Sequence, residues 1–159
     1  MKLLIAYDGS TYSEAALDDL TRAGMPDSAG EARVMSVAEV WLPPAHAVNS
    51  GNDETGEANS AAAADTYVEN IIERPRERAK KAVAEAEALA NHAKQRLQRI
   101  LPGWQIETEA TSGSPAWEVL TRAAEWRPDL IVVGSQGRSA VGRFFLGSIS
   151  NKILTEAHC

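Results

Sequence analysis

The chain has 159 residues and a mass of 17.1 kDa, and its 44% hydrophobic and 24% charged residues are typical of one globular domain over residues 1–159. This composition excludes a wholly disordered chain, a collagen and a disulfide-built miniprotein. With 16 lysines and arginines against 22 aspartates and glutamates, the formal net charge is −6, so we do not expect nucleic acid as a partner.

The first third of the sequence predicts a strand, a helix and a second strand. Residues 2–7 form a short apolar run that stops at Asp8, as a strand buried on both faces does. Apolar residues then recur at helical spacing over residues 11–23. Residues 32–42 are rich in valine and are followed by two prolines, which favours a second strand. We therefore expect a βαβ unit.

A polar insertion and a long helix follow. Residues 43–66 are mostly small or polar, show no sustained hydrophobic period and predict a variable loop. Apolar residues recur at helical spacing from residue 67 to residue 101. Because proline interrupts helices, we expect the main helix to begin near Pro75 and to end before Pro102.

The last third predicts two more strands and two more helices. Residues 104–110 alternate weakly, as in an outer strand, and a helix is expected from Pro115 to Trp126. Residues 129–133 predict a buried strand, and a final helix is expected to start near Ser148. This order predicts an α/β fold, a doubly wound parallel sheet with helices on both faces.

A spaced set of glycines follows the last predicted strand. Gly134 and Gly137 are followed, after nine residues, by Gly147 and Ser148 at the start of the last helix. Glycines permit close backbone approach and positive φ angles, and a helix N-terminus attracts anions. Since ligands of parallel sheets bind beyond the carboxyl ends of strands, this pattern predicts a phosphate site.

Other nucleotide and hydrolase motifs fit less well. Neither glycine pair has the Lys-Ser/Thr sequence of a P-loop, and the turn after the first strand lacks the dinucleotide fingerprint. Ser135 lacks the glycine two residues before it that a nucleophile elbow needs. His46, His92 and His158 do not have metal-ligand spacing. The sequence therefore predicts no catalytic residue and no protein-held metal.

The glycine pattern, together with an apolar first strand that ends in Asp8, resembles the universal stress protein family, specifically its ATP-binding branch. The likeness runs from Leu3 to Leu154. It implies strand order 3-2-1-4 and a fifth strand that the printed sequence does not include. It also implies a homodimer and a cofactor, ATP, accompanied by Mg²⁺.

The resemblance also implies which residues bind the nucleotide. Asp8 resembles the acid on the ribose or adenine side, and Val37 resembles the residue whose backbone meets adenine. The full implied set is Ala6, Tyr7, Asp8, Val37, Val133, Gly134, Gly137, Arg138, Gly147, Ser148, Ile149 and Ser150.

Each of these residues also has an ordinary structural interpretation. Asp8 can cap the first helix, and Ser148 can be an N-cap. Val37 and Val133 are core strand residues in the first place. The glycines can serve only a tight turn.

We expect an ATP-binding stress-response regulator with at most slow ATP hydrolysis, so enzymatic activity is left open. One alternative is a structural dimer module of the same family that binds no nucleotide. The other is an adenylate-forming enzyme of a related fold, which needs a serine-rich phosphate loop directly after the first strand. The turn here, Asp8-Gly9-Ser10-Thr11, is poorer in glycine and serine than that loop.

The sequence also indicates a compartment. The single cysteine, Cys159, cannot form an internal disulfide, and Asp8 interrupts the N-terminal apolar run where a signal peptide would continue. No segment has the roughly 18 apolar residues that crossing a bilayer requires. We therefore expect a cytoplasmic protein that does not bind membranes.

Overall fold

The computed structural model describes residues 1–25, 29–40, 74–137 and 146–159. Four parallel strands form one sheet in the order β3-β2-β1-β4. The elements are β1 (Lys2–Ala6), α1 (Thr11–Arg22), β2 (Glu31–Ala38), α3 (Arg74–Ile100), β3 (Gln105–Ser112), α4 (Pro115–Trp126), β4 (Leu130–Val133) and α5 (Ser148–Glu156). The predicted α/β class and strand order are confirmed.

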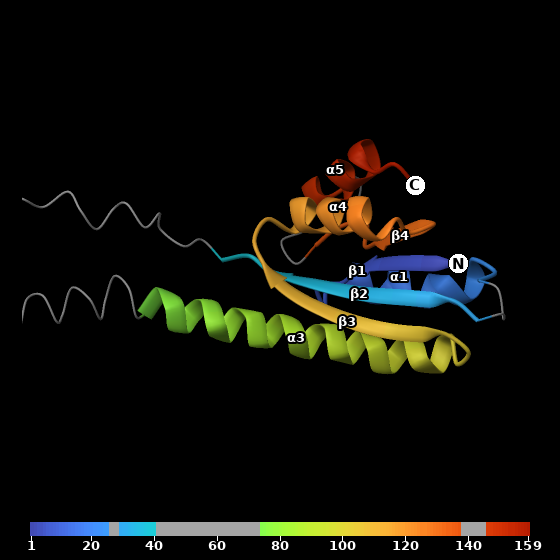
Figure 1. Ribbon diagram of the computed structural model, residues 1–159, viewed down its shortest axis with the longest axis horizontal. Coiled ribbons are helices and arrows are strands. Elements are labelled where there is room, and N and C mark those ends of the chain that lie inside the picture. Colours follow the sequence, from blue (N-terminus) through green and yellow to red (C-terminus); the bar gives the residue numbers. More distant parts are fainter. Residues whose placement is uncertain (26–28, 41–73, 138–145) are drawn as a thin grey trace, which may run out of the picture.

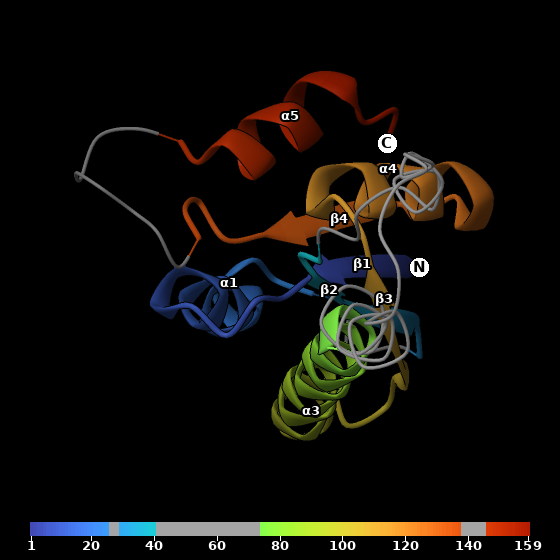
Figure 2. The ribbon, with the colours of Figure 1, turned by 90° about the vertical axis from the view of Figure 1, so that its left-hand side faces the viewer.

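Helices cover both faces of the sheet. Figure 1 shows α3 along one face, and α4 and α5 stacked over the other. The view turned by 90° places α1 on the same side as α3 (Figure 2). Among the described residues, no helix is both long and apolar enough to cross a membrane.

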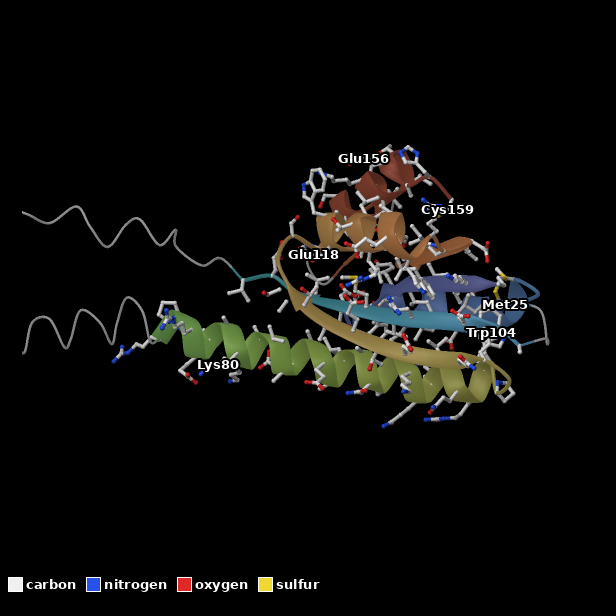
Figure 3. The ribbon with its side chains drawn as sticks, viewed as in Figure 1. Met25, Lys80, Trp104, Glu118, Glu156 and Cys159 are labelled. Carbon is white, nitrogen blue, oxygen red and sulfur yellow. The ribbon has the colours of Figure 1, made fainter. Side chains whose placement is uncertain are left out.

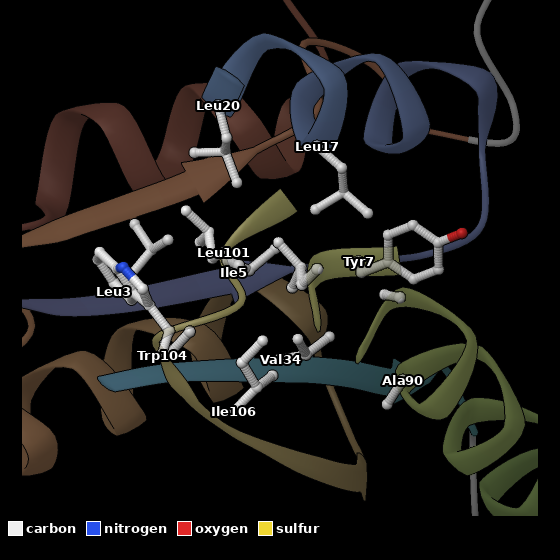
Figure 4. Close-up of a cluster of buried hydrophobic side chains, with 13 residues drawn as sticks. Leu3, Ile5, Tyr7, Leu17, Leu20, Val34, Ala90, Leu101, Trp104 and Ile106 are labelled. Carbon is white, nitrogen blue, oxygen red and sulfur yellow. The ribbon is translucent and has the colours of Figure 1, made fainter. Parts of the chain in front are cut away.

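Each face of the sheet has its own buried core, because neighbouring side chains of a strand point to opposite faces. One core lies between the sheet and the helices α1 and α3, and it includes Leu3 and Ile5 of β1 and Tyr7, which follows β1 (Figure 4). Leu4 packs instead with Met35 and with residues of α4 and α5. The first core is the larger, and it fixes α3 against the sheet.

Local sequence signals explain where the helices begin. The side chain of Ser10 caps α1 by accepting a hydrogen bond from the Ser13 amide at 3.2 Å. α3 is described from Arg74 onward, so Pro75 lies in the first described turn of this helix. The alanines that α3 buries, Ala86, Ala90 and Ala93, let this helix lie close to the sheet.

Two strands end at least two residues away from their predicted ends. β2 ends at Ala38, because residues 39 and 40 leave the sheet, and the remaining residues of the predicted strand lie outside the described part. β3 continues to Ser112, two residues past its predicted end, because it pairs with β2 along its whole length. The insertion predicted at residues 43–66 lies outside the described residues.

Candidate nucleotide site

A cleft of about 1070 Å³ opens at the carboxyl edge of the sheet. Its floor comes from the ends of β1, β2 and β4, and its walls come from α3 on one side and from the starts of α4 and α5 on the other. This is where ligands bind in open parallel sheets. The cleft is large enough for a nucleotide, since small-molecule sites span roughly 300–1,000 Å³.

Asp8 lies in the turn that leaves β1. Its Oδ1 accepts a hydrogen bond from the Ser10 amide at 3.0 Å, which orders the turn ahead of α1. Gly9 has a φ of +74°, and a Cβ there would lie 2.7 Å from a methyl carbon of Leu89. Only glycine fits both constraints, so the Asp8 carboxylate is held by a turn that α3 covers.

Gly137 approaches Asp8 from the loop that follows β4. A Cβ built on Gly137 would lie 3.2 Å from Asp8 Oδ2 and meet no other atom of the described residues within 4 Å. The missing side chain of Gly137 therefore leaves open space directly beside the Asp8 carboxylate. A bound group can reach the backbone of the loop at this point.

The N-terminus of α5 forms the opposite wall. Gly147 is its N-cap, and no side chain from the described residues caps the helix. The Gly147 amide bonds to Ser135 O at 2.8 Å, which ties the helix start to the loop after β4. Ser148 is exposed at the first helical position. The first amides of α5 and its positive dipole end are thus available to an anion in the cleft.

Gly134 has a structural role. A Cβ there would lie 2.7 Å from Ser13 N and 2.8 Å from Tyr12 C, both backbone atoms of α1. Ser150 Oγ donates a hydrogen bond to Gly134 O at 2.5 Å, so the hydroxyl of this buried serine is directed to the scaffold. Neither glycine has a positive φ, and at Gly134 the close approach of the α1 backbone is what excludes a side chain.

Behind the cleft, a polar network joins β1 to α1 and α3. The Tyr7 hydroxyl donates to Glu14 and lies 3.2 Å from His92 Nδ1. Glu14 also pairs with Arg96, whose guanidinium reaches Asp18 as well. Burial, followed by the hydrogen bond to Glu14, raises the pKa of Tyr7. The exposed side chain of His92, which lacks metal-ligand spacing in the sequence, takes part in this network.

The described lining of the cleft carries more negative than positive charge. It contains the carboxylates of Asp8, Glu39 and Glu85 and no lysine or arginine. Within the described ranges, no group of three or more histidine, cysteine, aspartate or glutamate side chains could hold a metal ion. An anionic ligand would therefore meet backbone amides and carboxylates together in this part of the site.

The predicted site residues converge on the cleft. Arg138 lies outside the described residues. The other eleven line the cleft, namely Ala6, Tyr7, Asp8, Val37, Val133, Gly134, Gly137, Gly147, Ser148, Ile149 and Ser150.

Sequence reasoning missed the contribution of α3. Ala82, Glu85, Ala86 and Leu89 line the cleft from this helix. Ala82, Ala86 and Leu89 belong to the apolar stripe at helical spacing, whereas Glu85 is one of the charged residues that the sequence pattern assigns to the solvated face of the helix. The stripe does face the core near Leu97, but its earlier turns face the cleft.

Comparison with known proteins identifies the family of this chain. The model of the universal stress protein family matches residues 1–159. The chain belongs to the universal stress protein family. A universal stress protein of Thermus aquaticus is 32% identical over 157 residues, with 99% of this chain and 93% of the relative covered.

Solved structures agree with this membership at the level of the fold. The structure of hypothetical protein MJ0577 gives a TM-score of 0.71 at 21% identity, covering 99% of this chain and 90% of that one. A universal stress protein family protein from Arabidopsis thaliana, solved with AMP bound, gives a TM-score of 0.52 at 18% identity. The coverage there is 100% of this chain and 87% of the Arabidopsis chain.

Proposed function

We propose that this universal stress protein binds ATP in the cleft and acts as a nucleotide-dependent stress-response regulator. The observation that carries the proposal is the position of the α5 N-terminus, which no described side chain caps and which shares one cleft with Gly137 and Asp8. The bound AMP of the Arabidopsis family member supports an adenine nucleotide as the ligand class.

The residues of the cleft fit the parts of a nucleotide. The phosphates would accept hydrogen bonds from the first amides of α5, and the Asp8 carboxylate would face the sugar. Val37 and Ala38 at the end of β2 and Ala86 of α3 supply apolar surface for the base. Phosphate charge beside Asp8 would need a counterion, so Mg²⁺ would enter with the nucleotide and keep most of its water.

The hydroxyl groups of the described lining give no sign of an activated nucleophile. Ser36 Oγ donates to Tyr7 O at 2.7 Å, and Ser150 Oγ donates to Gly134 O, so both hydroxyls serve the scaffold. The described lining contains no histidine that could act as a general base toward the remaining serine, Ser148. We therefore expect at most slow ATP hydrolysis and assign no catalytic residue.

The same proposal includes a homodimer in the cytoplasm. Within the described residues β4 pairs only with β1, so its other edge can accept a further strand. Light scattering at increasing protein concentration tests this part. A monomer at all concentrations would contradict it and leave nucleotide binding unaffected.

The test of nucleotide binding compares two aspartates placed on the same helix. Ser148→Asp adds a carboxylate beside the first amides of α5, where the dipole tolerates it but a phosphate is repelled. We expect ATP affinity to fall by about fivefold or more, the effect of two like charges about 4 Å apart. Isothermal titration with Mg²⁺-ATP measures the affinity, and acid-quenched chromatography identifies any nucleotide that co-purifies.

Two further variants separate charge from position. Thr155→Asp makes the same change in net charge at an exposed position in the last turn of α5. Ser148→Ala removes the hydroxyl without adding charge. Both should bind ATP within about twofold of the wild type, since neither puts charge at the helix start. If the wild-type protein is empty and has no affinity for Mg²⁺-ATP, the structural dimer module becomes the better explanation.

A further inference from the structure

Helix α3 forms a wall of the cleft that the family resemblance left without a ligand role. Leu89 packs over the turn at Gly9, next to Asp8, and so fixes the height of α3 relative to the end of β1. Glu85 precedes Leu89 by four residues and lies on the same side of the helix, about 6 Å nearer its N-terminus. Figure 1 shows α3 continuing past the ends of β2 and β3 in this direction.

The Glu85 carboxylate therefore lies beyond Asp8, on the outer part of the cleft. Its side chain is 67% exposed, and among the described residues it pairs with Lys81 Nζ at 4.0 Å. An exposed ion pair at this distance contributes little to stability. The carboxylate is free to turn toward a bound molecule, and when ionised it can only accept hydrogen bonds.

We propose that Glu85 is a specificity-determining residue that accepts a hydrogen bond from the nucleoside part of the bound nucleotide. This inference rests on the proposed function. With the phosphates at the start of α5 and beside Gly137, the sugar and base extend toward α3 and the outer cleft. The groups there that can donate to a carboxylate are the ribose hydroxyls and the amino group of the base.

The experiment removes the acceptor and compares nucleotides in which one donor group, a ribose hydroxyl or the amino group of the base, is deleted or replaced. Glu85→Ala should bind ATP about tenfold more weakly than the wild type, because a hydrogen bond to a charged acceptor is lost. Glu85→Gln keeps one amide oxygen as an acceptor, so its ATP affinity should lie between those of the wild type and Glu85→Ala. Alanine is a good helix former, so α3 should remain intact in the variant, which circular dichroism checks.

Two neighbouring variants are the controls. Lys81→Ala breaks the same ion pair but leaves Glu85 in place, and should bind ATP as the wild type does. Glu87→Ala removes an exposed carboxylate two residues away that does not line the cleft, and should also leave ATP affinity unchanged. Loss of affinity in either control to the same extent as in Glu85→Ala would overturn the proposal.

The analogues identify the donor. Wild-type protein and Glu85→Ala are each titrated with ATP, 2′-deoxy-ATP, 3′-deoxy-ATP and inosine triphosphate. Wild-type preference for ATP over one analogue should disappear in Glu85→Ala, and that analogue names the hydroxyl or amino group that Glu85 contacts. If Glu85→Ala binds ATP as the wild type does, or keeps every preference unchanged, the inference is wrong while ATP binding itself stands.

Discussion

The two ends of the sheet differ in how they are filled. At the amino end, Trp104 is buried against Gly30, where a Cβ would lie 2.8 Å from the indole ring. Backbone hydrogen bonds join the segments there, including Gln105 N to Gly30 O at 2.8 Å. At the carboxyl end, Gly137 faces the Asp8 carboxylate and a cleft of about 1070 Å³. Figure 3 shows Trp104 and Met25 together at the amino end.

This difference teaches that glycine serves opposite purposes at the two ends. Gly30 makes room for a large side chain of the protein itself, and the contact adds to the buried core. Gly137 makes room beside a charged group and is not filled by any described side chain. Stability should therefore depend mainly on the amino end, and ligand affinity mainly on the carboxyl end.

The largest expected effect on stability comes from removing the buried indole at the amino end of the sheet. Trp104→Ala removes a buried indole and should lower the free energy of unfolding by about 3–5 kcal/mol, from lost burial and the cavity left behind. Urea unfolding followed by circular dichroism measures this. Trp117→Ala is the matched control, because that indole is 57% exposed and should cost about 1 kcal/mol or less. Equal losses in the two variants would contradict the assignment of Trp104 to the core.

A smaller effect separates two glycines of one loop. Gly134→Ala forces a methyl group against backbone atoms of α1 and should cost about 1–3 kcal/mol of stability. Among the described residues, the methyl group of Gly137→Ala meets only the end of the Asp8 side chain, so stability should change by about 0.5 kcal/mol or less while Mg²⁺-ATP affinity falls. Urea unfolding and titration calorimetry on both variants test this. Equal unfolding midpoints for the two variants would contradict the structural role of Gly134.

Much of the fold could be predicted because short local sequence patterns indicate its helices and strands. The apolar run before Asp8, the Pro75 helix start and the glycine pattern each predict one feature with a direct physical cause. The strand order came from the family resemblance and is confirmed. The described strand β2 ends at Ala38, earlier than predicted, although the hydrophobic pattern of the sequence continues beyond it.

The part of the site that glycines and turns form could be predicted from the sequence. The part that α3 forms could not, because this helix contributes both to the core and to the cleft. Leu89 belongs to the same stripe as the core alanines and Glu85 lies among the charged residues of the helix, and periodicity does not tell which turns of α3 pass beyond the sheet. The hydrogen bond between Tyr7 and Glu14 and the approach of His92 join three elements, so no local signal marks them. Gly134 was expected to serve a ligand, although its contact is with α1.

The smallest expected effect concerns Tyr7, which ties the carboxyl end of β1 to α1. Tyr7→Phe removes the hydrogen bond to Glu14, while Arg96 still pairs with that carboxylate. The variant should lose about 1–1.5 kcal/mol of stability at neutral pH, the usual contribution of one hydrogen bond. Urea unfolding measures the loss, and unchanged stability at pH 8 would show that the hydroxyl contributes nothing.

The pH dependence of this loss distinguishes the hydroxyl from simple packing. Burial and the Glu14 hydrogen bond raise the pKa of Tyr7 above its ordinary value of 10.0, so the folded state keeps the phenol proton at pH values where the unfolded state loses it. The contribution of Tyr7 is therefore fully present below pH 10 and declines as pH rises toward the folded-state pKa. The stability gap between wild type and Tyr7→Phe should narrow between pH 10 and pH 11, by up to about 1.4 kcal/mol per pH unit. A gap that stays constant over this interval would mean that Tyr7 ionises alike in the folded and unfolded states, and the network behind the cleft would then be a packing contact only.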